Sequence, residues 1–217
     1  MAPLELEYNI RQPLTESNAA PLIVLLHGYG ADMNDLFSLA SELPDEALII
    51  APQAPHRLPW GGYAWWNFQQ SDTGVKSDFD QANRSIETLQ LFLDQIEEKY
   101  SYNRKKVILL GFSQGGMISY ATAFRRPEFF CGVLALSSYL MPEIMPEEEP
   151  NGSTLPPFFI SHGTEDPVLS VEGAQKSRDY LLSLDAKVEY HEYPMVHGIN
   201  PDNLLDARKW IDLTILK

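Results

Sequence analysis

A hydrophobic run that ends in a serine between glycines constrains this chain more than any other segment. The run is Val107–Leu110, and Gly-Phe-Ser-Gln-Gly-Gly follows at 111–116. This pattern predicts a buried strand, a tight turn and a helix over Met117–Phe124, because side chains at the glycine positions would collide with the turn. The turn would expose the hydroxyl of Ser113 at a helix N-terminus, which stabilises anions. The segment therefore predicts a nucleophile and half of an oxyanion site.

Apolar strand-like segments alternate with amphipathic helical segments along most of the 217 residues. This alternation predicts an α/β fold whose largely parallel sheet is covered by helices on both faces. The length favours a single domain over residues 1–217. Strands are expected at Pro21–Leu26, Ala47–Ala51, Val107–Leu110, Gly132–Leu136, Phe158–Ser161 and Val188–Tyr193, and helices at Leu36–Leu43, Phe79–Ile96 (capped by Ser77 or Asp78), Val171–Leu184 and Asp202–Leu216.

The formal charge of −14 disfavours nucleic acid and anionic lipid as partners, since both attract clustered lysine and arginine. No apolar run approaches the length that spans a bilayer, and the N-terminus lacks the pattern of a signal peptide. The single cysteine, Cys131, excludes an internal disulfide and fits a reducing compartment. We therefore expect a cytoplasmic protein that binds no nucleic acid and has no stable membrane association.

A serine hydroxyl becomes nucleophilic when a neighbouring base accepts its proton, so a histidine is expected at the end of a later strand. Among the five histidines, His197 follows the last predicted strand and precedes the last predicted helix. His27 and His162 also end strands, but His27 precedes Ser113 in the chain and His162 is close to an acidic pair. Chain order therefore favours His197 as the base. The remaining histidines, His56 and His191, are interpreted as structural.

The base needs a carboxylate that fixes its tautomer and stabilises the imidazolium, and this acid is expected between nucleophile and base. Glu165 and Asp166 meet that condition, shortly after the strand that ends at Ser161. Pro167 restricts the backbone of Asp166 to extended conformations, which would hold its carboxylate steady. The residues alone leave the choice between Glu165 and Asp166 open, and either also suits a turn.

A second oxyanion donor is expected in the loop after an early strand. The segment Leu-Leu-His-Gly-Tyr-Gly at 25–30 fits, because Gly28 and Gly30 permit an unusual backbone path. The N–H of Tyr29 would then lie beside the N–H of Gln114 at the reacting oxygen. A phosphate-binding loop is disfavoured, since the glycine spacing fits neither nucleotide fingerprint and no lysine follows.

Two loops interrupt the alternation. Residues 60–68 concentrate aromatic side chains, which indicate either a substrate wall or a local aromatic cluster, and we favour the wall. Met141–Pro157 combines five prolines with three consecutive glutamates and is interpreted as a solvated excursion. Loops at the carboxyl ends of parallel strands bind ligands in such folds. The expected substrate contacts are Trp65, Trp66, Phe68, Tyr139, Leu140 and Met141.

The motifs together resemble one family over nearly the whole chain. They are Leu-His-Gly-Tyr-Gly at 26–30, Ala-Pro-Gln-Ala-Pro at 51–55, Gly-Phe-Ser-Gln-Gly-Gly at 111–116, His162-Gly163 with Asp166-Pro167-Val168, and His197. Their order and spacing are similar to those of the phospholipase/carboxylesterase (acyl-protein thioesterase-like) family of α/β-hydrolases. The resemblance implies an α/β-hydrolase fold without a separate cap domain. It also implies Ser113 as nucleophile, Asp166 rather than Glu165 as acid, His197 as base, and the Tyr29 and Gln114 amides as oxyanion hole.

The sequence departs from the family pattern in two motifs, and its proline-rich segment Met141–Pro157 is longer than the family needs. Trp65-Trp66-Asn67 stands where the family commonly has Trp, an aromatic residue and Asp, and Tyr29 replaces a usual leucine. Acyl selectivity is therefore not carried over from the family.

The implied activity is that of a serine hydrolase that cleaves small-molecule carboxylic esters or thioesters of small to medium acyl groups through an acyl-enzyme, with no metal or organic cofactor. Family members include dimers, so a homodimer is compatible with the resemblance. Two alternatives are a non-catalytic binding protein with the same fold and a lysophospholipase or lipase-like enzyme at membrane surfaces. Labelling of Ser113 by a fluorophosphonate separates the first from an enzyme, and co-sedimentation with vesicles tests the second.

Overall fold

The computed structural model describes residues 4–15, 20–71, 74–148, 150 and 154–215. Its centre is a seven-stranded sheet in the order β1-β3-β2-β8-β9-β10-β11. Neighbouring strands of this sheet run parallel, except that β1 is antiparallel to β3. This sheet confirms the predicted fold class, with all six predicted strands in it. The strands are β1 (Tyr8–Arg11), β2 (Leu22–Leu26), β3 (Leu48–Pro52), β8 (Val107–Phe112), β9 (Gly132–Leu136), β10 (Phe158–Gly163) and β11 (Val188–Tyr193).

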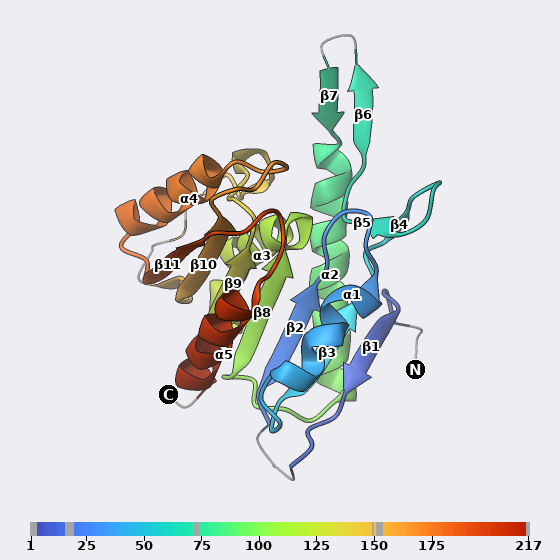
Figure 1. Cartoon of the computed structure of the whole chain (residues 1–217). Coiled ribbons are helices and arrows are strands. Elements are labelled where there is room, and N and C mark those ends of the chain that lie inside the picture. The colour runs from blue at the N-terminus through green and yellow to red at the C-terminus, as the bar shows by residue number, and fades with distance from the viewer. Residues whose placement is uncertain (1–3, 16–19, 72–73, 149, 151–153, 216–217) are drawn as a thin grey trace.

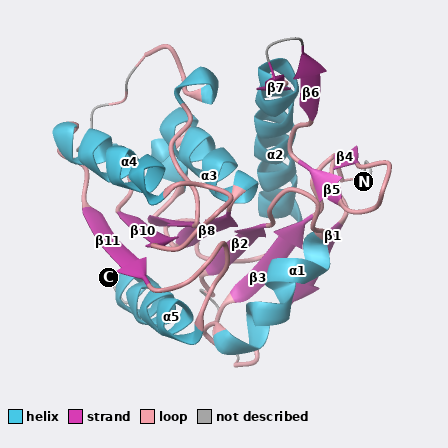
Figure 2. Cartoon of the chain, turned by 45° about the horizontal axis from the view of Figure 1, so that its top comes forward, coloured by secondary structure: helices cyan, strands magenta, loops and turns pink. Residues whose placement is uncertain are grey.

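Helices cover both faces of the sheet, as Figures 1 and 2 show. Helices α1 and α5 lie on one face, and α2, α3 and α4 lie on the other. The helices are α1 (Met33–Phe37), α2 (Phe79–Lys99), α3 (Gln114–Arg125), α4 (Val171–Ser183) and α5 (Pro201–Ile215), with short 3₁₀ turns η1 (Ser38–Glu42), η2 (Pro127–Phe129) and η3 (Pro142–Ile144).

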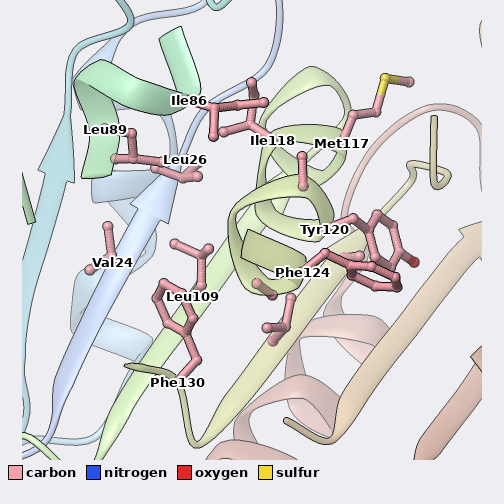
Figure 3. Packing of buried hydrophobic residues seen from close by; sticks show 14 of the residues in the cluster. Val24, Leu26, Ile86, Leu89, Leu109, Met117, Ile118, Tyr120, Phe124 and Phe130 are labelled. Atoms are coloured by element: carbon pink, nitrogen blue, oxygen red, sulfur yellow. The ribbon is translucent and has the colours of Figure 1, made fainter. Parts of the chain in front are cut away.

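The central strands are buried on both faces, and their alternate side chains enter two separate cores. Val24 and Leu26 of β2 belong to the core under α2 and α3, whereas Ile23 and Leu25 belong to the core under α1 and α5. Figure 3 shows the first core, where Ile118 of α3 lies among these side chains. Each fully buried aliphatic side chain contributes about 1.5–3 kcal/mol relative to exposure. This burial on both sides explains why the strands are continuous apolar runs.

Helix α2 begins where the sequence predicts. Asp78 is its N-cap, and its carboxylate accepts a hydrogen bond from the N–H of Gln81 at 2.9 Å. The helix continues to Lys99, three residues beyond the predicted end at Ile96. Helix α4 agrees with its prediction to within one residue at its C-terminal end. Helix α5 begins one residue early, at Pro201, and the predicted last residue, Leu216, lies outside the described residues.

Several short elements were not predicted. Strand β1 has only two large apolar or aromatic residues among four and is half-buried, so its pattern is weak. The predicted helix Leu36–Leu43 is divided into α1 and the 3₁₀ turn η1. The 3₁₀ turns η2 and η3 were not predicted either, nor were two small hairpins, β4 (His56–Arg57) with β5 (Tyr63–Ala64) and β6 (Phe68–Ser71) with β7 (Gly74–Ser77).

The carboxyl ends of four parallel strands carry the predicted functional residues. Strand β8, at the centre of the sheet, leads into Ser113, while β2 leads into the loop that contains Tyr29. Strands β10 and β11 lead into the loops that contain Asp166 and His197. Because parallel strands end on the same side, these loops share one edge of the sheet.

Candidate active site

Ser113 occupies a strained turn between β8 and α3. Its backbone has φ 53° and ψ −118°, a conformation that costs energy for a residue with a side chain. The neighbouring glycines are required for space: a Cβ at Gly115 would lie 2.0 Å from the carbonyl oxygen of Leu26, and one at Gly111 would lie 2.3 Å from that of Gly115. The predicted strand, turn and helix are thus present. A side chain at Gly111 would collide with the turn, as predicted, whereas one at Gly115 would collide with the end of β2.

The hydroxyl of Ser113 lies in hydrogen-bond distance of His197. Ser113 Oγ is 3.0 Å from His197 Nε2, although 84 residues separate them in the chain. His197 follows β11, and its ring also lies against Phe112, with ring centroids 4.9 Å apart. The imidazole is partly exposed, with 17% of the side chain accessible. This geometry suits a base that accepts the proton of the serine and remains reachable from solvent.

The second ring nitrogen of His197 contacts Asp166. Nδ1 is 2.7 Å from Asp166 Oδ2, and the aspartate side chain is fully buried. Burial raises the pKa of Asp166, but hydrogen bonds from the backbone N–H of Leu169, from His197 and from Val168 outweigh burial and lower that pKa below its ordinary value. The carboxylate is therefore ionised at neutral pH, as a group that stabilises an imidazolium must be. Glu165, the other candidate acid, is exposed.

The loop after β2 follows an unusual backbone path. Gly30 has φ 81°, a conformation that side chains rarely permit, and its N–H donates to the carbonyl oxygen of Tyr63. Among the described residues, the backbone N–H groups of Tyr29 and Gln114 have no hydrogen-bond acceptor. Both N–H groups are therefore available to donate a hydrogen bond to an acceptor.

The buried imidazole of His27 holds this loop. Its Nδ1 is 2.8 Å from the carbonyl oxygen of Gly28, and its Nε2 accepts the N–H of Ala54 at 3.1 Å. The side-chain amide of Gln53 also contacts Nε2, at 3.0 Å. The contacts require a neutral ring with its proton on Nδ1, because Nε2 faces two donors. The His27 side chain thus stabilises the loop after β2, and its ring contacts Gly28, Gln53 and Ala54 rather than Ser113.

Protonation of His27 should destabilise the fold. Burial lowers its pKa below the ordinary 6.5, although the hydrogen bond to Gly28 partly opposes this. The unfolded chain takes up a proton near pH 6.5, whereas the folded protein does so only at lower pH. The free energy of unfolding is therefore expected to fall as the pH falls below about 6.5, down to the lowered pKa. Denaturant titrations across this range measure the slope.

A glutamine at position 27 supplies the control for this pH dependence. In His27→Gln the side-chain carbonyl can still accept the N–H of Ala54, but it does not titrate, so a shallower slope is expected. His191→Gln removes a partly exposed histidine and should keep the original slope. Equal slopes for the original chain and His27→Gln would contradict this assignment.

The side chain of Gln114 joins the nucleophile turn to the aromatic segment. Gln114 Oε1 accepts the N–H of Trp65 and its Nε2 donates to the carbonyl oxygen of Trp66, both at 2.8 Å. The segment before them pairs with the loop after β2, since the N–H of Tyr63 donates to the carbonyl oxygen of Ala31. One short stretch, 63–66, therefore ties together both loops that carry the free N–H groups.

The structure places the predicted aromatic wall in two different environments. Trp65 and Trp66 are 0% and 1% exposed, and the indole N–H of Trp65 donates to the carbonyl oxygen of His27. Substrate would reach either indole only if the side chains that cover it moved. Phe68 is different, because it is 45% exposed and its ring lies 4.9 Å from that of Tyr29. Phe68 thus faces solvent beside the ring of Tyr29, and Trp60 of the same segment is also exposed, at 73%.

The loop after β9 contributes to a cavity. Tyr139 and Leu140 line it, whereas Met141 is buried in the core. The cavity has a volume of about 640 Å³, within the range of ligand pockets. Its other lining residues, from the following segment and α4, are Pro142, Met145, Pro146, Glu147, Gly173, Lys176, Ser177 and Tyr180. Part of the segment predicted as a solvated excursion therefore forms a cavity wall.

The rest of Met141–Pro157 is mixed in exposure. Glu147 and Glu148 are exposed, in agreement with a solvated excursion, but Ile144 and Leu155 are buried in the core. Residues 149 and 151–153 of this segment lie outside the described residues. The prediction for the whole segment is thus wrong for its apolar members, which anchor it to the core.

Sequence reasoning missed a residue that fixes the loop of His197. Ser137, directly after β9, has φ 45°, and its hydroxyl donates to the carbonyl oxygen of Gly198 at 3.0 Å. Its N–H also donates to the carbonyl oxygen of Ser161. The only signal in the sequence is a serine after a strand, which is too common to indicate such a contact.

The described residues contain no group of three or more His, Cys, Asp or Glu side chains that would hold a metal ion. No helix within the described ranges is both long enough and apolar enough to cross a bilayer.

The sequence and the fold of this chain are similar to those of known hydrolases. A family model described as Phospholipase/Carboxylesterase matches residues 12–215. Acyl-protein thioesterase 1 of Debaryomyces hansenii is 29% identical, covering 96% of this chain and 97% of its own. The putative hydrolase MhqD of Bacillus subtilis is also 29% identical, covering 87% and 91%. The solved structure of esterase PE8 superposes with a TM-score of 0.83 at 26% identity, covering 96% and 99%.

A further solved structure supports the fold alone. The Bacillus cereus carboxylesterase has a TM-score of 0.80 at 20% identity and covers 96% of this chain and 94% of its own.

Proposed function

This chain belongs to the phospholipase/carboxylesterase family, and we propose that it cleaves small-molecule carboxylic esters or thioesters through an acyl-enzyme on Ser113. Relatives named as thioesterase and esterase support a serine hydrolase of this substrate class. The observation that carries the assignment is the continuous path of hydrogen-bond distances from Ser113 through His197 to Asp166, at 3.0 and 2.7 Å. This path joins three loops that are far apart in the sequence.

The first half of the reaction forms the acyl-enzyme. Ser113 Oγ attacks the acyl carbon while His197 Nε2 accepts the hydroxyl proton, and the Asp166 carboxylate stabilises the resulting imidazolium. The oxyanion of the tetrahedral intermediate accepts hydrogen bonds from the N–H groups of Tyr29 and Gln114. The bond to the leaving alcohol or thiol then breaks, and His197 returns its proton to that group.

The second half regenerates the enzyme. His197 accepts a proton from water, and the resulting hydroxide attacks the acyl carbon bound to Ser113. The same two N–H groups hold the second oxyanion. Collapse of this intermediate releases the carboxylic acid, and the proton on His197 returns to Ser113 Oγ. The cycle consumes one water for each ester or thioester.

We propose that the acyl group of the substrate extends toward the cavity lined by Tyr139 and Leu140. This loop follows β9 and lies close to the nucleophile helix, since a Cβ at Gly116 would lie 2.3 Å from Ser138 Oγ. The cavity wall is mainly apolar, which suits a hydrocarbon chain. Phe68 and Tyr29 supply apolar surface beside the oxyanion donors.

A panel of chromogenic esters and acyl thioesters from acetyl to decanoyl tests the proposed function. We expect saturable hydrolysis of at least one series, with release of the free acid and covalent labelling of Ser113 by a fluorophosphonate. Absence of turnover on every member, together with no labelling of folded protein, would contradict an acyl-enzyme. The same panel measures the preference between oxygen and sulfur leaving groups.

Filling the cavity should shorten the preferred acyl chain. Met145 lines the cavity, so Met145→Trp is expected to lower kcat/KM for octanoyl and decanoyl esters by about 10-fold, while acetyl ester turnover stays within about twofold. Leu182→Trp, on an exposed position of α4 outside the cavity, is the control. An equal effect of Met145→Trp on all chain lengths would show that acyl chains bind elsewhere.

We also propose that the protein is a single domain, is cytoplasmic and works without stable membrane association. The negative formal charge of −14 opposes binding to anionic lipid surfaces, which supports this view over a lipase-like enzyme at membranes. Co-sedimentation with vesicles of anionic phospholipid tests the proposed lack of membrane association. The protein is expected to remain in the supernatant.

A further inference from the structure

His162 is a buried histidine that the reaction steps above do not use. It lies in β10, four residues before Asp166, and its side chain is 0% exposed. Its Nε2 is 2.8 Å from the carbonyl oxygen of Leu169 and 3.1 Å from Asp166 Oδ2. A carbonyl oxygen only accepts hydrogen bonds, so the ring proton must be on Nε2. One N–H is thus shared between the turn backbone and the carboxylate.

The other contacts of Asp166 restrict the position of its Oδ2 only weakly, and the Nε2–H group of His162 can hold this oxygen in place. Oδ1 accepts the N–H groups of Val168 and Leu169, at 2.8 and 2.9 Å, whereas Oδ2 contacts His197 at 2.7 Å. The final torsion of an aspartate side chain is broad, so backbone contacts to Oδ1 alone restrict it weakly. A second donor on Oδ2 holds that oxygen in line with His197.

The opposite side of the imidazole gives independent support. Among the described residues, His162 Nδ1 is buried without a hydrogen-bond partner. Burying an unpaired polar atom costs free energy, and an apolar side chain of similar size would avoid this cost. Packing alone therefore does not account for a histidine here, whereas the contact from Nε2 to the carboxylate does.

We propose that His162 is a positioning residue that fixes the orientation of the Asp166 carboxylate toward His197. The inference rests on the proposed function, since it assumes that Asp166 is the acid of the reaction. His162 acts through Asp166 and is assigned no contact with substrate. Its loss should therefore lower kcat and leave KM nearly unchanged, because substrate binding does not depend on the carboxylate.

Two amide substitutions of different reach test the proposal. Glutamine at 162 can place its amide nitrogen near the position of Nε2, whereas the shorter asparagine reaches only the position of Nδ1. His162→Gln is expected to retain kcat within about fivefold, and His162→Asn to lower kcat by about 10- to 100-fold with KM within about twofold. His191→Gln is the matched control, because His191 contacts Glu189 on β11 and should not change kcat. Equal kcat values for the two amide variants would overturn the proposal.

A double-mutant cycle separates positioning from general support of the fold. In an Asp166→Asn background the carboxylate is already absent, so adding His162→Asn should change kcat by less than about twofold. The same loss in both backgrounds would overturn the proposal. If Asp166→Asn alone keeps full activity, the proposed function fails. If it lowers kcat strongly but measurably and the His162 effect is additive, only this inference fails.

The tautomer of His162 provides a measurement that requires no variant. Nitrogen-15 NMR of histidine-labelled protein at neutral pH should show the proton on Nε2 of His162, with Nδ1 unprotonated. A proton on Nδ1 with Nε2 unprotonated would overturn the proposal, because Nε2 would then have nothing to donate. Circular dichroism and thermal unfolding establish that each amide variant is folded before its kinetics are compared.

Discussion

Ser113→Ala is expected to lower kcat for esters by about 10⁴-fold or more while the protein remains folded. The change removes the oxygen that lies 3.0 Å from His197 Nε2, so no acyl-enzyme can form. Residual hydrolysis would come from the oxyanion donors and substrate binding alone, which still accelerate attack by water. The purified variant should therefore also show no covalent labelling by a fluorophosphonate.

A matched serine substitution controls for unspecific effects. Ser183 lies at the exposed end of α4, where its hydroxyl donates to the carbonyl oxygen of Tyr180, so Ser183→Ala should keep full activity. Thermal unfolding of Ser113→Ala is needed as well, because alanine keeps the positive φ of 53°. Turnover of this variant near that of the original chain would rule out Ser113 as the nucleophile.

The nucleophile turn could be predicted because its sequence pattern is local. Gly111 and Gly115 lie two positions on either side of Ser113. The contact that excludes a side chain at Gly111 arises within the same strand, turn and helix, whereas the contact at Gly115 is with Leu26 of the neighbouring strand β2. The six parallel strands could be predicted for a similar reason. Burial on both faces makes the central strands continuous apolar runs, as in Ile23–Leu25 of β2, whereas the edge strand β11 is only partly buried and also carries polar residues.

The choice between Glu165 and Asp166 could not be made from local pattern. Both residues follow β10 within three positions, and only the loop after β11 decides which carboxylate meets His197. The family resemblance favours Asp166, and the geometry agrees, since Glu165 is exposed. The contact of His162 with the same carboxylate depends equally on the path of the turn, which composition and periodicity do not specify.

Aromatic side chains in a loop were a poor guide to exposure. Trp65 and Trp66 follow a tight turn in a glycine-containing loop, yet both indoles are buried because the Gln114 side chain holds their backbone against α3. Those two hydrogen bonds join residues about 49 positions apart, so no window of the sequence contains both partners. Local sequence patterns do not reveal contacts between residues so far apart in the chain, so the burial of the two indoles could not be predicted.

Asp166→Asn is expected to lower kcat by about 10⁴-fold with little change in KM. The asparagine side chain fits the same space, but its NH₂ group can face His197 Nδ1, which lies 2.7 Å from Oδ2 in the structure. Nδ1 would then accept a hydrogen bond, so the proton would move to Nε2. A protonated Nε2 cannot accept the proton of Ser113, and the imidazolium would also lack its negative partner. The loss should therefore appear in kcat at every acyl chain length.

Glu165→Gln is the matched control, because it removes an adjacent carboxylate of the same charge. Glu165 is exposed, and the contact recorded for its backbone, from its N–H to the carbonyl oxygen of Met195, survives the substitution. Its kcat should stay within about twofold of the original. If the two variants lost activity equally, net charge near the site would explain the effect. If Glu165→Gln alone were inactive, the acid would be Glu165, and the relay from Ser113 through His197 would have to reach it by a different path of the loop after β10.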